Sequence, residues 1–126
     1  MAKELFRLNV DDAQTETHIW GTIKWLCNSK IVPGAKQTFG YVRIYPGRRN
    51  GEHLHPNCEE IIFVSQGECD HYIGDKVTRL RTGDMLFVPE GSFHYAVNIG
   101  KKDLILVISY SSPDRETKTK EIKKSE

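Results

Sequence analysis

Short apolar runs separated by turn residues are the feature that most limits how this chain can fold. Between residues 19 and 110 each run is four to eight residues long and rich in β-branched and aromatic types, which is typical of strands. Clusters of Pro, Gly and Asp lie between the runs and favour turns. This span shows no convincing amphipathic helix, so we expect an all-β sandwich or barrel. Examples of the runs are TFGYVRIY, EIIFVSQ, CDHYI, DMLFV, HYAV and DLILVISY.

The length of 126 residues, with 38% hydrophobic residues, suits one domain with its own core. We expect N-terminal strands or an extension in residues 1–37, the barrel core in residues 38–112, and a charged flexible tail in residues 113–126. That last segment, PDRETKTKEIKKSE, has nine charged residues and a single aliphatic one. It cannot bury enough apolar surface to offset the entropy lost on ordering.

Charge, hydropathy and cysteine usage narrow the function classes. A formal net charge of +1 gives no support for a nucleic-acid-binding surface. The longest uninterrupted apolar run, LILVI, is far too short to span a bilayer, and the N-terminus has no apolar signal-like segment. The three cysteines form no CxxC pair, which favours reduced thiols. We therefore expect a cytoplasmic protein whose partner is a small molecule, and neither a nucleic acid nor a membrane.

The most distinctive polar pattern is a pair of histidines, His53 and His55, followed by Glu59 and Glu60. Residues two apart on a strand point to the same face, so one metal ion could contact both imidazoles. A Pro-Asn pair interrupts the strand after the histidines, and parity alone does not decide which glutamate joins them. His94, at the start of another predicted strand, could add a third imidazole. Such a set suits one divalent transition metal ion (Mn, Fe, Co, Ni, Cu or Zn) with two positions open.

The two polar stretches resemble the two sequence motifs of the cupin superfamily. The first reads Gly-x5-His-x-His-x4-Glu-x6-Gly from Gly47 to Gly67, and the second reads Gly-x5-Pro-x-Gly-x2-His-x3-Asn from Gly83 to Asn98. Every signature position is occupied at a permitted spacing, and the fifteen residues between the motifs are typical of small prokaryotic members. With the flanking strands, the resemblance covers roughly residues 38–110.

This resemblance implies a small single-domain protein with a jelly-roll β-barrel of two antiparallel sheets. It also implies that the metal ligands are His53, His55, Glu60 and His94, so that Glu60 rather than Glu59 points to the metal. The glycines of the motifs are expected to serve turns, because such turns need a positive φ.

Three further residues are candidates for chemistry. His71 enters the barrel if Cys69 and Ile73 also face inward. It could then support a metal ligand or act as a general acid or base, the alternative being a histidine hydrogen-bonded in the barrel wall. Tyr41 and Arg43 share one face of the strand before the first motif. If that face is inside, Arg43 could hold a carboxylate in a bidentate pair; otherwise it is a solvated strand face.

A divalent ion with three neutral imidazoles and one carboxylate has a net charge near +1, which favours carboxylate, enediol or phenolate ligands. The resemblance implies a metal-dependent enzyme, and we expect a dioxygenase-type oxidoreductase. The alternatives are a non-redox isomerase, lyase or decarboxylase, with His71 or a tyrosine as the base, and a small-molecule-binding module without turnover, because fold does not fix function. We also expect a homodimer, in which N-terminal residues such as Trp20 and Trp25 or an exposed sheet edge could form the contact.

Overall fold

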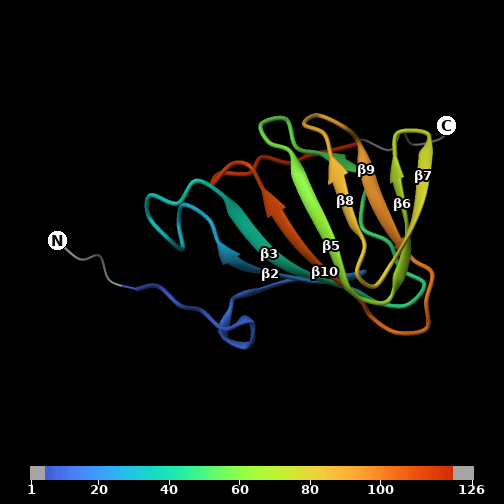
Figure 1. The fold of residues 1–126 in the computed structure, drawn as a ribbon, viewed down its shortest axis with the longest axis horizontal. Helices are drawn as coiled ribbons and strands as arrows, with labels where there is room; N and C mark the ends of the chain where they lie inside the picture. Colours follow the sequence, from blue (N-terminus) through green and yellow to red (C-terminus); the bar gives the residue numbers. More distant parts are fainter. Residues whose placement is uncertain (1–4, 121–126) are drawn as a thin grey trace.

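The computed structural model describes residues 5–120, and its regular structure is almost entirely β-strand (Figure 1). Within these residues the only helical element is a short 3-10 turn, η1 (Val10–Asp12). The strands form two antiparallel sheets in a jelly-roll arrangement, which confirms the expected all-β fold. The hydrogen bonds between described strands do not close the two sheets into one continuous barrel. No helix within residues 5–120 is long and apolar enough to cross a membrane.

The six-stranded sheet has the order β1-β2-β3-β10-β5-β8. Its strands are β1 (Thr15–His18), β2 (Gly21–Cys27), β3 (Thr38–Ile44), β10 (Leu104–Tyr110), β5 (Glu60–Gln66) and β8 (Met85–Val88). The five-stranded sheet has the order β11-β4-β9-β6-β7. Its strands are β11 (Lys118–Thr119), β4 (His53–Leu54), β9 (His94–Asn98), β6 (Glu68–Ile73) and β7 (Lys76–Arg81).

The hydrophobic core lies between the sheets and follows from the two-residue alternation of the strands. On β5, Ile62 and Val64 are buried while Ile61 and Phe63 are exposed. Buried residues of β3, β5 and β10 pack with buried residues of β6, β7 and β9 from the other sheet. Gly67 joins β5 to β6 with a φ of 92°, a conformation that glycine adopts without strain. Alternating apolar residues thus give each sheet one inner face.

The segment after β10 corrects one expectation from the sequence. Residues 113–120 were expected to belong to a flexible tail, but β11 pairs with β4 in the structure. The backbone of Glu116 is also hydrogen-bonded to the side chains of Asn57 and His55. These long-range hydrogen bonds, rather than apolar burial, place the segment against the rest of the fold. Residues 121–126 of the expected tail lie outside the described range.

Candidate metal centre and its pocket

Four residues from different strands bring their side chains together at one end of a pocket. His53 on β4 lies directly opposite His94 on β9, and Glu60 is the first residue of β5. His55 follows β4 by one residue. One ligand atom from each of the four lies within 4.8 Å of the others. The structure therefore gathers all four predicted ligands, and it points Glu60 inward while Glu59 is exposed.

The inner atoms of this cluster lack partners among protein groups. The carboxylate Oε1 of Glu60 is 3.5 Å from Nε2 of His55 and 3.3 Å from Nε2 of His94. All three atoms are buried and have no hydrogen-bond partner. Unpaired buried polar atoms are costly, and a cation between them would satisfy all three at once. The donor set thus fits a divalent transition metal ion.

The electrostatic environment keeps His53 and His94 in the form that can bind a metal. Burial, together with repulsion from the neighbouring His53, His71 and His55, lowers the pKa of His94 to about 2. Burial also lowers the pKa of His53 below its usual value. Metal ligation requires the neutral imidazole. These rings are therefore neutral at physiological pH without a proton having to leave.

The outer ring nitrogens of His53 and His55 are held by backbone carbonyls. Nδ1 of His53 lies 2.6 Å from the carbonyl oxygen of Gly51. Nδ1 of His55 lies 2.9 Å from the carbonyl oxygen of Glu116. When Nδ1–H donates to a carbonyl, the lone pair is on Nε2, and the ring is fixed with Nε2 pointing inward. The residues around β4 and the segment before β11 thus orient two of the candidate ligands.

His71 supports the third imidazole. Its Nε2 lies 3.0 Å from Nδ1 of His94, and the two rings are stacked with centroids 5.2 Å apart. Cys69 and His71 are both buried on β6. His71 therefore faces inward together with Cys69, which is the first of the two alternatives that the sequence left open. Burial lowers the pKa of His71 to about 4. Because His71 is neutral, buried and in contact with His94, it can hold the imidazole of His94 in position.

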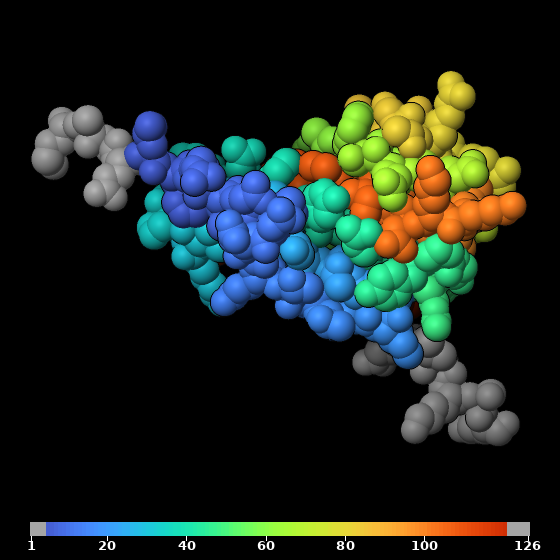
Figure 2. Space-filling view, turned by 90° about the horizontal axis from the view of Figure 1, so that it is seen from below, coloured from blue at the N-terminus to red at the C-terminus, as the bar shows by residue number. Residues whose placement is uncertain are grey.

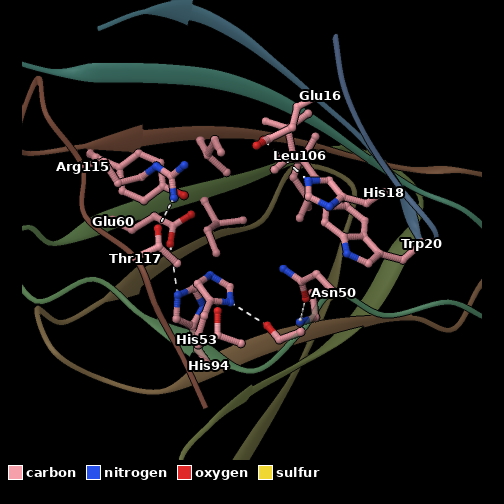
Figure 3. A pocket seen from close by; sticks show the side chains of 18 of the residues that line it. Glu16, His18, Trp20, Asn50, His53, Glu60, His94, Leu106, Arg115 and Thr117 are labelled. Atoms are coloured by element: carbon pink, nitrogen blue, oxygen red, sulfur yellow. Dashed lines mark hydrogen bonds and ion pairs between the residues drawn. The ribbon is translucent and has the colours of Figure 1, made fainter. Parts of the chain in front are cut away.

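The cluster opens into a cavity of about 400 Å³, a size typical of small-molecule sites. Figure 3 shows His53, His94 and Glu60 at one end, with Arg115 and Thr117 nearby and Asn50 and the N-terminal residues Glu16, His18 and Trp20 on the other side. The remaining wall is mainly apolar. Its apolar residues are Ile23, Trp25, Val42, Ile62, Ala96, Leu106, Ile108 and the ring of Tyr110, and Gly51, His71 and Thr119 complete it.

The N-terminal hairpin forms part of the pocket wall. Figure 2 shows these residues in blue across one side of the molecule. His18 at the end of β1 stacks on Trp20, with ring centroids 4.6 Å apart and an interplanar angle of 5°. Trp25 on β2 contacts the core and also lines the cavity. Both tryptophans, which the sequence suggested as dimer contacts, therefore face the pocket.

The structure does not bring Tyr41 and Arg43 to the site. Val42 and Ile44 take the buried face of β3, which leaves Tyr41 and Arg43 on the outer face. Arg43 instead pairs with Asp103, with Nη1 2.7 Å from Oδ2. The sequence left both faces of this strand open. The apolar β-branched side chains occupy the inner face because burying them releases more free energy than burying an arginine.

Sequence reasoning missed several residues of the pocket, among them Tyr110 and Arg115. Tyr110, the last residue of β10, is buried beside Glu60, and burial raises its pKa well above the usual value. The alternation of the DLILVISY run could have placed it inward. The guanidinium of Arg115 lies 4.4 Å from the ring centroid of Trp25 and 5.4 Å from that of Tyr110. Arg115 belongs to a charged segment without strand periodicity, so no local signal pointed to it.

Comparison with known proteins agrees with this geometry. The cupin domain family matches residues 40–110. Protein SchB of Streptomyces halstedii is 29% identical over 97 residues, which cover 77% of this chain and 70% of SchB. Oxalate oxidase 1 of Hordeum vulgare is 33% identical over 75 residues, which cover 53% of this chain and only 37% of that protein.

Solved structures show the same fold. Oxalate decarboxylase of Lactobacillus farciminis, in a formate complex, superposes with a TM-score of 0.81 at 23% identity, over 86% of this chain and 34% of that one. A recombinant oxalate oxidase in complex with glycolate has a TM-score of 0.77 at 25% identity, over 90% and 62% of the two chains. This chain thus spans about a third of the length of the decarboxylase. On the match over residues 40–110, the chain belongs to the cupin family.

Proposed function

We propose that this protein is a metal-dependent cupin enzyme of the dioxygenase type. Its substrate would be a small organic molecule that presents carboxylate, enediol or phenolate oxygens. The observation that supports this most is the set of buried, unpartnered atoms of His55, Glu60 and His94 at the end of a largely apolar cavity. His53, His55, Glu60 and His94 would hold one divalent transition metal ion. When bound, that ion would supply Lewis acidity and, if redox-active, electrons for reaction with dioxygen.

The protein's own residues would bind and orient the substrate. Arg115 is a positive charge at the metal end of the cavity, and apolar side chains line most of the rest, where a bound substrate would displace water. His71 would hold His94 in place through the 3.0 Å contact between their rings. Exclusion of water strengthens each electrostatic contact within the site.

The dioxygenase hypothesis is favoured by the weakness of His71 and Tyr110, the two candidate bases buried beside the histidine cluster. A non-redox isomerase or lyase needs a group that accepts a proton. The pKa of His71 is lowered to about 4 by burial, and its Nε2 is already engaged with His94. The Tyr110 hydroxyl, whose pKa is raised by burial, is held in its neutral form. Neither group is suited to abstract a proton at neutral pH.

A decarboxylase is the second candidate, because loss of carbon dioxide does not require a strong base. The similarity to oxalate oxidase 1 and to the glycolate-bound oxalate oxidase supports a carboxylate group on the substrate in either case. A binding module without turnover would use the same ligands and the same cavity.

The first experiment is elemental analysis of protein purified without a chelating tag, together with a His53→Ala/His94→Ala variant. We expect about one transition metal ion per chain in the wild type and loss of that metal in the variant. If the wild type neither carries nor takes up metal on reconstitution, the proposal of a metal enzyme is wrong.

Oxygen consumption then separates the candidate reactions. The metal-loaded protein is incubated with a panel of small carboxylates, enediols and catechols, in air and under strict anaerobiosis. A dioxygenase consumes dioxygen in step with product and stops without it. Turnover that continues without dioxygen would identify a decarboxylase or another non-redox enzyme, and tight binding without product would identify a binding module.

A further inference from the structure

Arg115 is a cation in the cavity without an anionic partner. Among residues 5–120 no carboxylate forms an ion pair with it, although other ion pairs are present. Its one side-chain hydrogen bond in this range is donated to the hydroxyl of Thr117. A guanidinium has five N–H donors, and it favours planar carboxylate partners. Most of the hydrogen-bonding capacity of this half-buried side chain is therefore available to a ligand.

The guanidinium is also held in a fixed orientation. It lies over the ring of Trp25 at 4.4 Å and near that of Tyr110 at 5.4 Å, distances typical of cation–π contacts. These contacts use the faces of the aromatic rings and take up none of the N–H donors in hydrogen bonds, so the donors remain for a ligand. Such a cation loses little side-chain entropy when it binds an anion.

The backbone on each side of Arg115 is fastened to the fold. Asn57 Nδ2 donates to the carbonyl oxygen of Asp114 at 2.9 Å, and Asn57 Oδ1 accepts from the backbone N–H of Glu116 at 2.9 Å. The carbonyl oxygen of Glu116 in turn accepts from His55. One asparagine thus bridges the residues before and after Arg115, and the same short segment contacts a candidate metal ligand.

The volume and the apolar wall of the rest of the cavity indicate what the non-anionic part of the ligand is. A two-carbon dianion would fill a small part of about 400 Å³, and it would leave the surfaces of Trp20, Ile23 and Leu106 facing water. An aromatic or branched aliphatic group would cover those surfaces and gain about 25 cal/mol per Å² buried. The cavity therefore favours a ligand with one anionic end and an apolar body.

We propose that Arg115 is the carboxylate-binding residue of this pocket, and that the substrate is an organic monoanion with an aromatic or branched aliphatic body rather than a small dianion such as oxalate. This assignment rests on the proposed function, since it names the substrate class of the same site. It adds a specificity-determining residue from outside both histidine motifs.

Intrinsic tryptophan fluorescence provides the test, because both tryptophans of the chain line the cavity. The full-length protein is titrated with benzoate, its neutral counterpart benzamide, acetate and oxalate, in metal-loaded and metal-free form. We expect the wild type to bind benzoate at least about tenfold more tightly than benzamide, acetate or oxalate, where tenfold corresponds to about 1.4 kcal/mol. Arg115→Gln should lose about tenfold in benzoate affinity and less than about twofold in benzamide affinity.

Matched variants separate anion binding from folding. Lys118→Gln removes an exposed charge from the same segment and should leave every affinity unchanged. Arg115→Lys keeps the charge without the bidentate edge and should show an intermediate loss. If Arg115→Gln has no cooperative thermal transition, the comparison of Arg115→Lys with Lys118→Gln decides the question in its place.

The outcomes distinguish this inference from the proposed function. Benzoate binding that is absent, or unchanged by the Arg115 substitutions in both forms, would overturn the role of Arg115. Acetate or oxalate binding as tightly as benzoate would overturn the apolar-bodied substrate. Absence of any metal uptake would instead overturn the metal enzyme, while Arg115-dependent benzoate binding by the metal-free protein would still support the inference.

Discussion

Nε2 of His71 lies 3.0 Å from Nδ1 of His94, inside the core of the fold. His94 also directs Nε2 toward Glu60 at 3.3 Å. If His94 binds a metal through Nε2, Nδ1 carries the proton and donates it to His71. The pair is the side-chain counterpart of the carbonyl contacts that orient His53 and His55. All three candidate imidazole ligands therefore have their second nitrogen fixed.

His71→Leu removes the acceptor for His94 and leaves a buried N–H unpaired. We expect metal affinity to fall by about 10- to 100-fold, measured by competition with a chromogenic chelator. His71→Gln, which can offer an amide oxygen, should restore part of that loss. The matched control His18→Leu changes a histidine that lies outside the cluster and should leave metal affinity within about twofold. Equal metal affinity of His71→Leu and the wild type would contradict the role of His71 in positioning His94.

Burial of His71 as a neutral ring predicts a pH dependence of stability for the metal-free protein. Its pKa is lowered from 6.5 to about 4 by burial. Below pH 6.5 the unfolded chain therefore binds a proton that the folded protein does not, and stability falls as the pH drops from 6.5 to about 4. The contribution lost is on the order of 3 kcal/mol. Urea denaturation at several pH values measures it.

The same measurement on His71→Leu is the control for this prediction. Without the titrating ring, the decline in unfolding free energy between pH 6.5 and 4 should become shallower by the His71 contribution. A residual slope is expected from His94, whose pKa burial lowers to about 2. Parallel pH profiles for the two proteins would contradict the prediction.

Glu60 and Glu59 offer a matched pair of adjacent carboxylates. Glu60 is only 3% exposed and faces the histidines, whereas Glu59 is exposed. Glu60→Gln keeps the shape but removes the charge that would offset a divalent cation. We expect a loss of at least about tenfold in metal affinity for Glu60→Gln and no change for Glu59→Gln. Metal content after dialysis against a weak chelator gives the readout, and equal retention by both variants would refute it.

Removal of residues 113–126 deletes Arg115 and the Glu116 carbonyl that contacts His55 at 2.9 Å. We expect the shortened chain to fold with lower thermal stability and to bind metal several-fold more weakly, because His55 loses an orienting contact. A chain ending at Lys120 keeps β11 and its pairing with β4. That longer form should match the full chain in both measurements, and equal behaviour of the 112-residue chain would contradict the role given to this segment.

The outer face of the six-stranded sheet supports the expectation of a homodimer. Cross-strand neighbours of β5 and β8 place Ile61 beside Phe87 and Phe63 beside Met85, and all four are 43–58% exposed. We expect this face to pack against the same face of a second copy, since a self-complementary apolar surface suits a two-fold contact. Light scattering should give twice the chain mass for the wild type and the single-chain mass for Phe63→Glu.

The control for that prediction is Val77→Glu. Val77 is 54% exposed on β7 of the other sheet, so the substitution adds the same charge away from the proposed contact. The Val77→Glu protein should remain a dimer. A monomeric wild type would contradict the homodimer itself, and a dimeric Phe63→Glu variant would move the contact to another face.

The sequence by itself determined the strand pattern and the candidate ligand set. Both depend on local spacing: two-residue alternation puts Ile62 and Val64 on one face, and His53 and His55 are two residues apart. Parity left the choice between Glu59 and Glu60 open, and only the resemblance to the cupin motif selected Glu60, which the structure buries while Glu59 is exposed. Such patterns can be recognised in the sequence because the side chains of a strand alternate between its two faces, independently of the rest of the chain.

Only the tertiary structure decided which face of a strand is inside and which distant groups meet. Alternation on β3 separated Tyr41 and Arg43 from Val42 and Ile44 without saying which pair is buried. The choice follows from packing of Val42 and Ile44 into the core shared with the other sheet, which no local pattern contains. Arg115 reaches the pocket through hydrogen bonds between residues about 60 positions apart. Contacts at that separation form because the folded sheets bring the two segments together. The local sequence of the charged segment does not predict these contacts.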